Sequence, residues 1–291
     1  MKIGFVGLGI MGKPMAKNML KAVDHVFVND INKASEAELV SMGAVALSIT
    51  DMAEQADYII VSLPTGAIVK AVLYSGEASL LDASTINVKG IIDTSSLTPN
   101  ESLEISKVLE EKGITYFDAP VSGGEPLAIS GDLAVMVGCE ASYLPEIRRV
   151  LEPVAKSVIR VGDVGAGSVV KLANQIIVNT NIAALSEAVV LGKKFDIDLE
   201  SMFEAIRGGL AGSQVMEAKF PKMIDEDYTP GGTLNINLKD MKNVNSTADT
   251  VGLTLPLSNM VKEFYKSEVA SGHGLNDHSG IIKYFEKINN M

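Results

Sequence analysis

The chain begins with a short apolar run that leads directly into three regularly spaced glycines. In residues 2–7, KIGFVG, the apolar residues do not alternate with polar ones, which is typical of a buried strand. The glycines follow as Gly7-x-Gly9-x-x-Gly12, and a helix is expected over residues 11–22. A strand, a glycine turn and a helix in this order bind the pyrophosphate of a dinucleotide. In that role Gly7 permits the tight turn, Gly9 lets the backbone approach the phosphates, and Gly12 allows close helix–strand packing.

Buried strands and helices go on alternating through the first half of the chain. Further strands are expected at HVFVND, YIIVSLP, GIIDTSS, ITYFDAP and DLAVMVGC, with helical stretches between them. This alternation predicts an α/β fold with a doubly wound, parallel, Rossmann-type sheet over residues 1–162.

The second part of the chain has a different character. Neither proline nor glycine interrupts residues 168–191, so one long helix is expected there, about 36 Å at 1.5 Å per residue. The remainder reads as helices with breaks near RGGLAGS and YTPGGT. We therefore predict an all-helical domain for substrate binding and oligomerisation over residues 163–291, which begins with this long helix.

Composition and charge exclude several classes of protein. The formal charge of −11 argues against binding to nucleic acid or to an anionic membrane surface. The single cysteine excludes an internal disulfide, and together with three scattered histidines it offers no metal site. There is no signal-peptide pattern and no run of about 18 apolar residues. A cytoplasmic location is expected, because a chain without disulfides suits a reducing compartment.

The end of the second strand bears on which dinucleotide is bound. Asp30 lies 18 residues beyond Gly12, where an acidic side chain binds the adenosine ribose hydroxyls and repels a 2′-phosphate. NAD is therefore favoured over NADP. Asn29 and Lys33 flank this position, and either could help to hold a phosphate, so NADP stays open. Residues 62–67 and 93–99 follow later strands, where such sheets bind ligands, although plain loops are equally common there.

Two further segments suggest chemistry. In GDVGAGSVVKLANQ, Lys171 and Asn174 share one helix face, although a lone lysine there is more often a surface residue. In FDAPVSGGEP, Ser122, Gly123 and Gly124 offer a hydroxyl and two unobstructed backbone N–H groups, which suit a carboxylate. Reduction of a carbonyl by a nicotinamide needs a proton for the oxygen, and a protonated lysine can donate it.

Four ordered segments together resemble one family. GFVGLGIMGKPMAKNM, DAPVSGGEPLAISGDLAVMVG, GDVGAGSVVKLANQ and NLKD are similar to the motifs of β-hydroxyacid dehydrogenases. That family includes 3-hydroxyisobutyrate dehydrogenase and 2-hydroxy-3-oxopropionate (tartronate semialdehyde) reductase. The resemblance spans nearly the whole chain. It implies a Rossmann domain, an all-helical domain, NAD or NADP as cofactor, and a homodimer or homotetramer.

The resemblance also implies roles for individual residues. Lys171 would be the catalytic proton donor and acceptor, and Asn174 would bind the substrate. Ser122, Gly123 and Gly124 would bind the substrate carboxylate. Lys239 would lie near both substrate and cofactor. The implied cofactor contacts are Gly7, Gly9, Ile10, Met11, Gly12, Asn29, Asp30, Leu63, Pro64, Ser96 and Lys239.

The expected function is interconversion of a small β-hydroxy acid and its semialdehyde. The leading pair is 2-hydroxy-3-oxopropionate and glycerate. The alternatives are 3-hydroxyisobutyrate, 4-hydroxybutyrate or a larger branched hydroxy acid, and a scaffold that binds dinucleotide without catalysis. Departures from the family pattern at 127–133 and 232–233 leave the substrate open. Ser213 and the Asp277–His278 pair are weaker candidates, because a helix N-cap and a polar loop explain them as well.

Overall fold

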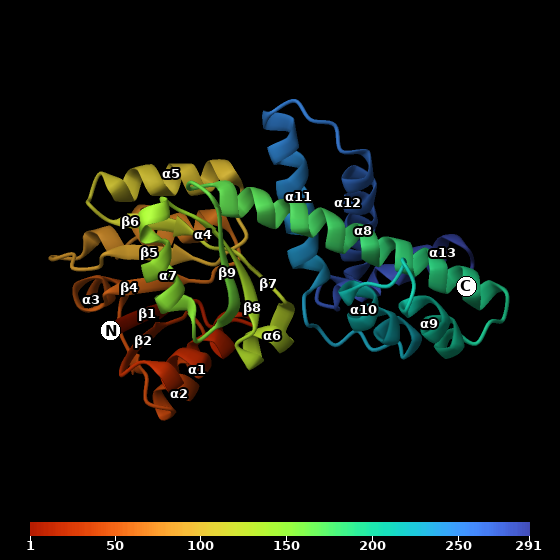
Figure 1. Cartoon of the computed structure of the whole chain (residues 1–291), viewed down its shortest axis with the longest axis horizontal. Coiled ribbons are helices and arrows are strands. Elements are labelled where there is room, and N and C mark those ends of the chain that lie inside the picture. The colour runs from red at the N-terminus through yellow and green to blue at the C-terminus, as the bar shows by residue number, and fades with distance from the viewer. The chain divides into compact units, whose positions relative to one another are not determined.

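The computed structural model describes residues 1–291, which form two compact units, Met1–Lys171 and Leu172–Met291 (Figure 1). The first unit is an α/β structure and the second is all-helical, as predicted. The division between the units falls inside α8 (Ala166–Lys194), a few residues after the predicted domain boundary.

The sheet of the first unit has a parallel part and a mixed edge. Six parallel strands run in the order β3-β2-β1-β4-β5-β6. Beyond them β8 lies antiparallel to β6, and it pairs with β7 and β9. The prediction of a parallel sheet is therefore wrong at this edge. The segment between β6 and β8 is used for β7 and the short α6, and it does not return across the sheet as a parallel crossover must. The strands are β1 (Lys2–Val6), β2 (His25–Asn29), β3 (Val45–Ala46), β4 (Tyr58–Val61), β5 (Gly90–Asp93), β6 (Thr115–Asp118), β7 (Val121–Ser122), β8 (Leu133–Gly138) and β9 (Ala155–Gly162).

Helices cover both faces of this sheet, so it is doubly wound as predicted. One core packs α1, α2, α6 and α7 against the sheet, and a separate core packs α3, α4 and α5 against the other face. Alternate residues of a strand enter the two cores, as Phe5 and Val6 of β1 do. The helices are α1 (Gly12–Ala22), α2 (Lys33–Ser41), α3 (Ile49–Gln55), α4 (Gly66–Lys70), α5 (Pro99–Glu110), α6 (Gly124–Ser130) and α7 (Leu144–Leu151), with short turns at Ala71–Ser75, Leu80–Asp82 and Ala141–Tyr143.

Helix α8 is longer than predicted at both ends. It is long and apolar enough to cross a membrane by length and composition, but half of its most apolar window is buried in protein. Central helices of globular proteins share this property. Its length is therefore explained by packing.

The second unit consists of the later part of α8 and five further helices around one core. These are α9 (Leu199–Arg207), α10 (Gln214–Ile224), α11 (Leu234–Thr250), α12 (Pro256–Glu268) and α13 (Ile282–Ile288), with short turns at Val269–His273 and His278–Ile281. Large side chains such as Phe220, Met241 and Tyr265 are fully buried in this core. The breaks predicted near 207–213 and 228–233 are confirmed as the connections before α10 and α11.

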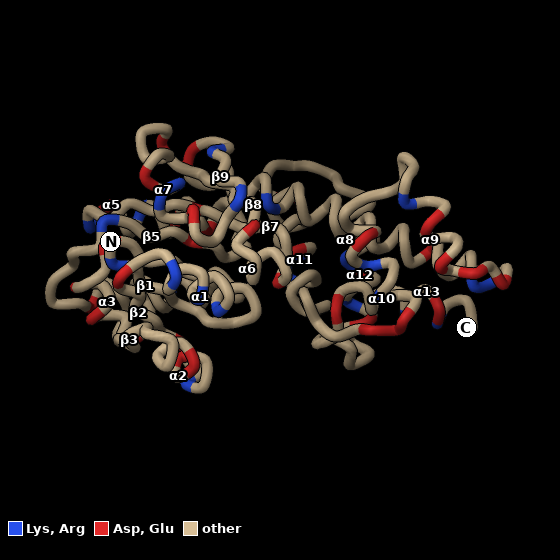
Figure 2. The backbone as a smooth tube through the Cα atoms, turned by 60° about the horizontal axis from the view of Figure 1, so that its bottom comes forward, with Lys and Arg blue, Asp and Glu red and all other residues tan.

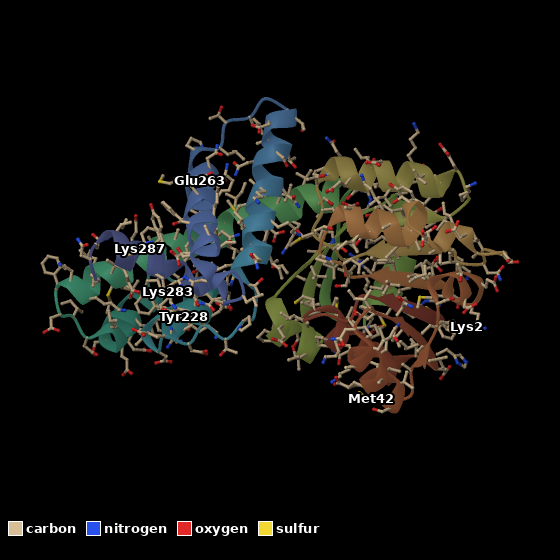
Figure 3. The ribbon with its side chains drawn as sticks, turned by 180° about the vertical axis from the view of Figure 1, so that it is seen from behind. Lys2, Met42, Tyr228, Glu263, Lys283 and Lys287 are labelled. Carbon is tan, nitrogen blue, oxygen red and sulfur yellow. The ribbon has the colours of Figure 1, made fainter.

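A loop of the second unit is fixed from several sides. The ammonium group of Lys283 lies 4.6 Å from the ring centroid of Tyr228, and both residues are labelled in Figure 3. Nearby, Lys219 forms an ion pair with the fully buried Asp277. These contacts hold the chain that leads into α11.

Charged residues of both signs are distributed over both units. Figure 2 shows Lys and Arg interspersed with Asp and Glu along the backbone, with no long basic stripe.

Candidate functional site

The glycine turn between β1 and α1 has the backbone that its sequence predicts. Gly7 has a φ of +92°, and a Cβ atom there would lie 2.2 Å from the carbonyl oxygen of Ser62. A Cβ atom on Gly12 would lie 1.9 Å from the carbonyl oxygen of Gly7. Gly9 is different, because nothing lies within 4 Å of the position of its Cβ. Gly7 and Gly12 are thus required by the turn, whereas Gly9 leaves open space where a pyrophosphate would approach the backbone.

The end of β2 carries negative charge beside this turn. The carboxylate of Asp30 accepts hydrogen bonds from the backbone N–H groups of Leu8 and Asn32, the latter at 2.6 Å. The ammonium group of Lys33 lies 2.9 Å from the carboxylate of Glu36, which is 7% exposed. The side chain of Asn29 donates to the carbonyl of Leu47 at 2.6 Å. Lys33, the cation at this end of β2, is therefore paired with Glu36.

The loops after β4 and β5 are hydrogen-bonded to each other. The backbone N–H of Leu63 donates to the hydroxyl of Ser95 at 2.9 Å, and the hydroxyl of Thr94 donates to the carbonyl of Val61 at 2.8 Å. Both loops follow the carboxyl ends of parallel strands, where open α/β sheets bind ligands. The contacts join the two loops that contain the predicted cofactor residues Leu63, Pro64 and Ser96, whose role stays a prediction.

The Ser-Gly-Gly turn joins β7 to α6. Gly123 and Gly124 have φ values of +138° and +67°, a conformation that L side chains rarely adopt. A Cβ atom on Gly123 would also lie 2.7 Å from the side chain of Leu127. Successive backbone N–H groups in such a turn can point at one anion. Both positions of this turn therefore favour glycine.

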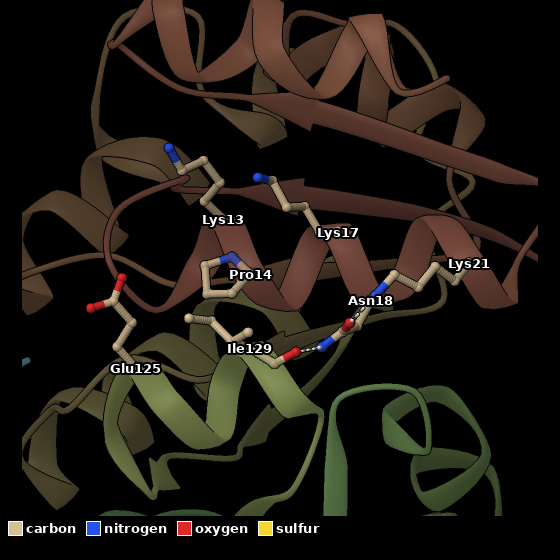
Figure 4. Close-up of a pocket in the computed structure, with 7 residues that line it drawn as sticks. All are labelled: Lys13, Pro14, Lys17, Asn18, Lys21, Glu125 and Ile129. Atoms are coloured by element: carbon tan, nitrogen blue, oxygen red, sulfur yellow. Dashed lines mark hydrogen bonds between the residues drawn. The ribbon is translucent and has the colours of Figure 1, made fainter.

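Helices α1 and α6, which follow these two turns, are joined to each other. The side-chain amide of Asn18 on α1 donates to the carbonyls of Ala128 and Ile129 on α6, at 3.0 and 3.2 Å. A cavity of about 270 Å³ lies beside this contact (Figure 4). Its lining residues are Lys13, Pro14, Lys17, Asn18, Lys21, Glu125 and Ile129. The helix that follows the glycine turn is thus hydrogen-bonded to the helix that follows the Ser-Gly-Gly turn.

Lys171 is part-buried near the start of α8, in the same compact unit as both turns. The first turn of α8 is held by Asp118 at the end of β6. The Asp118 carboxylate accepts hydrogen bonds from the backbone N–H groups of Gly165 and Ser168, both at 2.8 Å. Lys171 follows Ser168 by three residues and so lies on the same face of the helix.

The second unit holds the remaining predicted substrate residues. Asn174 lies on α8 and donates to Gln175 at 3.0 Å. Gln175 in turn donates to the buried Asp240 at 2.6 Å, and Lys239 lies 2.9 Å from Asp240. One amide–carboxylate contact therefore ties α8 to α11 and orients the two predicted residues.

The two weaker candidates have structural roles. Ser213 is the N-cap of α10 and accepts from the backbone N–H of Met216 at 3.0 Å, which confirms the N-cap interpretation. Asp277 binds Lys219 with both carboxylate oxygens at 3.0 Å and also accepts from the backbone N–H of Gly231. Burial alone would raise the pKa of Asp277, but His278, Lys219 and the backbone donors together lower it to about 2. Asp277 therefore has a structural role, because it joins Lys219 of α10 to the loop at Gly231.

Sequence reasoning did not identify Asp118, Asn18 or Asp240 as parts of the site's framework. The available signal was weak. Asp118 is the last residue of a buried strand, and Asn18 lies inside an amphipathic helix. Polar side chains are seldom buried at such positions, as these two are. No group of three or more His, Cys, Asp or Glu side chains is arranged to hold a metal ion.

Comparisons with known proteins agree with this geometry. Residues 2–162 match the model of the NAD binding domain of 6-phosphogluconate dehydrogenase. Residues 165–285 match the model described as NAD-binding of NADP-dependent 3-hydroxyisobutyrate dehydrogenase.

Similar proteins cover nearly the whole chain. A 2-(hydroxymethyl)glutarate dehydrogenase from Eubacterium barkeri is 38% identical over 99% of this chain and 95% of its own length. A 2-hydroxy-3-oxopropionate reductase from Escherichia coli K12 is 35% identical over 100% of this chain and 99% of its own. The structure of a 3-hydroxyisobutyrate dehydrogenase from Salmonella typhimurium has a TM-score of 0.85 and 31% identity, over 97% of this chain and 99% of that one.

The chain therefore belongs to the β-hydroxyacid dehydrogenase family of NAD(P)-dependent enzymes. The predicted family, fold class and enzyme class are confirmed. The names of its relatives differ in substrate, so the substrate is treated separately below.

Proposed function

We propose that this enzyme interconverts 2-hydroxy-3-oxopropionate and glycerate, with NAD as the favoured cofactor. The observation that carries the proposal is the position of Lys171, which follows the anchored Ser168 of α8 by one helical turn and lies in one compact unit with the glycine turn and the Ser-Gly-Gly turn. The E. coli relative named for this substrate supports the choice, since it matches the chain over its whole length.

The glycine turn fits a dinucleotide. The open space beside Gly9 and the positive φ of Gly7 leave backbone N–H groups at the start of α1, where they can meet a pyrophosphate. Asp30 would accept from the adenosine ribose. Ile10, Met11, Leu63, Pro64, Ser96 and Lys239 remain predicted contacts. A bound nicotinamide supplies or accepts a hydride at the substrate's alcohol carbon.

The protein's own residues would hold the substrate and move the proton. Ser122, Gly123 and Gly124 would bind the substrate carboxylate through a hydroxyl and two backbone N–H groups. Lys171 would donate a proton to the aldehyde oxygen during reduction and take it back during oxidation. Asn174 would orient the hydroxyl by hydrogen bonding.

A second candidate substrate is 2-(hydroxymethyl)glutarate. The observation that favours it is the 38% identity to the E. barkeri enzyme of that name. This acid carries a second carboxylate on a longer branch, so it needs a larger pocket and an additional donor or cation. Leu127, which is 40% exposed beside the Ser-Gly-Gly turn, presents an apolar surface there. This surface favours the smaller acid.

Initial rates test the proposal. We expect kcat/KM for 2-hydroxy-3-oxopropionate to exceed the values for the semialdehydes of 3-hydroxyisobutyrate, 4-hydroxybutyrate and 2-(hydroxymethyl)glutarate. We also expect a higher kcat/KM with NADH than with NADPH, and both reactions can be followed by nicotinamide absorbance. A higher kcat/KM for the dicarboxylic substrate would replace the first candidate with the second. Cofactor binding without turnover of any acid would refute the proposed reaction.

A further inference from the structure

The carboxylate of Asp118 occupies an unusual place in the first unit. It is 1% exposed, and its two oxygens accept the backbone N–H groups of Gly165 and Ser168. These N–H groups belong to the start of α8, where a helix has no backbone acceptors of its own. The acceptor therefore comes from a residue 47 positions earlier in the chain. Asp118 fastens the first turn of α8 to the end of β6.

Two glycines show how closely this turn is seated. A Cβ atom on Gly138 would lie 2.0 Å from the Oδ1 of Asp118. A Cβ atom on Gly167 would lie 2.5 Å from the carbonyl of Met136 and 2.6 Å from that of Asp118. Backbone atoms cannot move aside cheaply, so the start of α8 has only one position against the strands.

A chain of buried hydroxyl groups connects the same turn to the loops after β4 and β5. The hydroxyls of Ser168 and Ser102 are 2.9 Å apart. Burial raises the pKa of Tyr116 well above its ordinary value, and Ser102 lowers it in part. The Tyr116 hydroxyl donates to Asp93 at 2.9 Å. Asp93 accepts from the backbone N–H of Ser95, whose hydroxyl accepts from Leu63. The helix that carries Lys171 is thus hydrogen-bonded to α5, which follows the loop after β5, and that loop is hydrogen-bonded to the loop after β4.

From this geometry we propose that Asp118 is a positioning residue, which together with the Ser168–Ser102 contact fixes Lys171 relative to the cofactor loops. The inference rests on the proposed role of Lys171 as the proton-transfer group. Lys171 lies one helical turn beyond Ser168, so a shift of the first turn moves the lysine directly. A displacement of about 1 Å can cost about 100-fold in rate.

Stability alone does not explain a carboxylate at this position. Burial raises the pKa of Asp118 to about 6, although the N–H groups of Gly165 and Ser168 lower it. The folded state thus disfavours the charged form, and this group stabilises the fold more as the pH falls through 6 toward its ordinary range near 4. At neutral pH the protein keeps a buried charge at a cost to its stability. In its charged form Asp118 accepts two hydrogen bonds from the start of α8, one with each oxygen.

The decisive variant is Asp118→Asn. Asparagine has nearly the same shape, but it has only one acceptor oxygen, so it can hold only one of the two N–H groups. We expect a kcat at least about tenfold lower for reduction, an unchanged affinity for NADH, and a melting temperature close to that of the wild type. The matched control is Asp163→Asn, whose exposed side chain lies near the same end of α8. A smaller loss of kcat in Asp118→Asn than about tenfold overturns the proposal.

The pH profile separates positioning from a merely structural role. In wild-type enzyme the kcat for reduction should fall below a pH of about 6 toward the Asp118→Asn level, while the variant stays flat there. The titratable groups that interact with the Asp118 carboxylate are Tyr116 and Cys139, and the charged groups beside those two are Asp93, Arg160 and Asp163. Burial raises the pKa of both Tyr116 and Cys139, so neither changes charge near pH 6. An identical acid limb in both enzymes overturns the assignment.

Two readouts do not need turnover, so they distinguish failure of this inference from failure of the proposed function. Amide hydrogen exchange over residues 164–171 should be faster in Asp118→Asn than in Asp163→Asn. Trace acetylation of Lys171, measured against the exposed Lys156, should also change in Asp118→Asn alone. Unchanged exchange and labelling overturn the inference even if no substrate is found. Should Asp118→Asn not fold, Ser168→Ala decides: a wild-type kcat overturns the proposal, and a loss of about threefold or more supports it.

Discussion

Two alanine substitutions in the same glycine turn should affect different properties, because the surroundings of the two glycines differ: Gly12→Ala should lower stability and Gly9→Ala should weaken cofactor binding. Gly12→Ala would place a methyl group 1.9 Å from the backbone oxygen of Gly7. Overpacking of this kind costs about 1–3 kcal/mol. At about 2–4 °C per kcal/mol for a unit of this size, the melting temperature of the first unit should fall by roughly 2–12 °C.

Gly9→Ala should leave the fold intact and weaken the binding of the cofactor. The methyl group meets no atom within 4 Å, so the free energy of unfolding should stay within about 0.5 kcal/mol of the wild-type value. The same methyl group occupies the space through which a pyrophosphate would approach the backbone. Loss of one charge-assisted hydrogen bond, about 1.5–3 kcal/mol, corresponds to roughly 10- to 100-fold weaker binding.

The assays are thermal unfolding followed by circular dichroism and NADH titration followed by fluorescence. Gly208→Ala is the matched control, because Gly208 also has open space around its Cβ position and lies outside the turn. It should change neither quantity. A Gly9→Ala protein that binds NADH as tightly as the wild type would refute the placement of the pyrophosphate. A Gly12→Ala protein with an unchanged melting temperature would refute the packing argument.

Three further predictions concern the proton donor, the buried ion pair and self-association. Lys171→Ala should lose most turnover while its NADH affinity stays unchanged, and wild-type turnover in a rate assay would remove Lys171 from the mechanism. Lys219→Ala should lower the free energy of unfolding by about 3–5 kcal/mol in urea titrations at pH 7, because it strands the buried Asp277 carboxylate. The exposed Lys266→Ala should change it by less than about 1 kcal/mol, and equal effects would contradict the argument. Finally, we propose a homodimer or homotetramer, so light scattering at micromolar concentration should give a multiple of 30.8 kDa, and a monomer mass would refute this.

Local patterns in the sequence were enough to predict the glycine turn and the division of the fold into an α/β part and an all-helical part. A strand, a glycine turn and a helix involve contacts between near neighbours, and their periodicity is written in consecutive residues. The all-helical second unit and its two breaks followed from the same kind of signal. The antiparallel edge of the sheet did not, because β8 carries the same apolar run whichever way it enters the sheet.

Tertiary structure alone decided which polar residues support the site. Asp118 and Gly165 are 47 residues apart, and Gln175 and Asp240 are 65 apart. No local pattern links them, because each pair forms only after strand order and helix packing have brought the partners together. The sequence determined which residues could do the chemistry, since their types and spacing are local properties. The folded chain determined which carboxylates are buried, what they accept, and therefore which groups they hold in place.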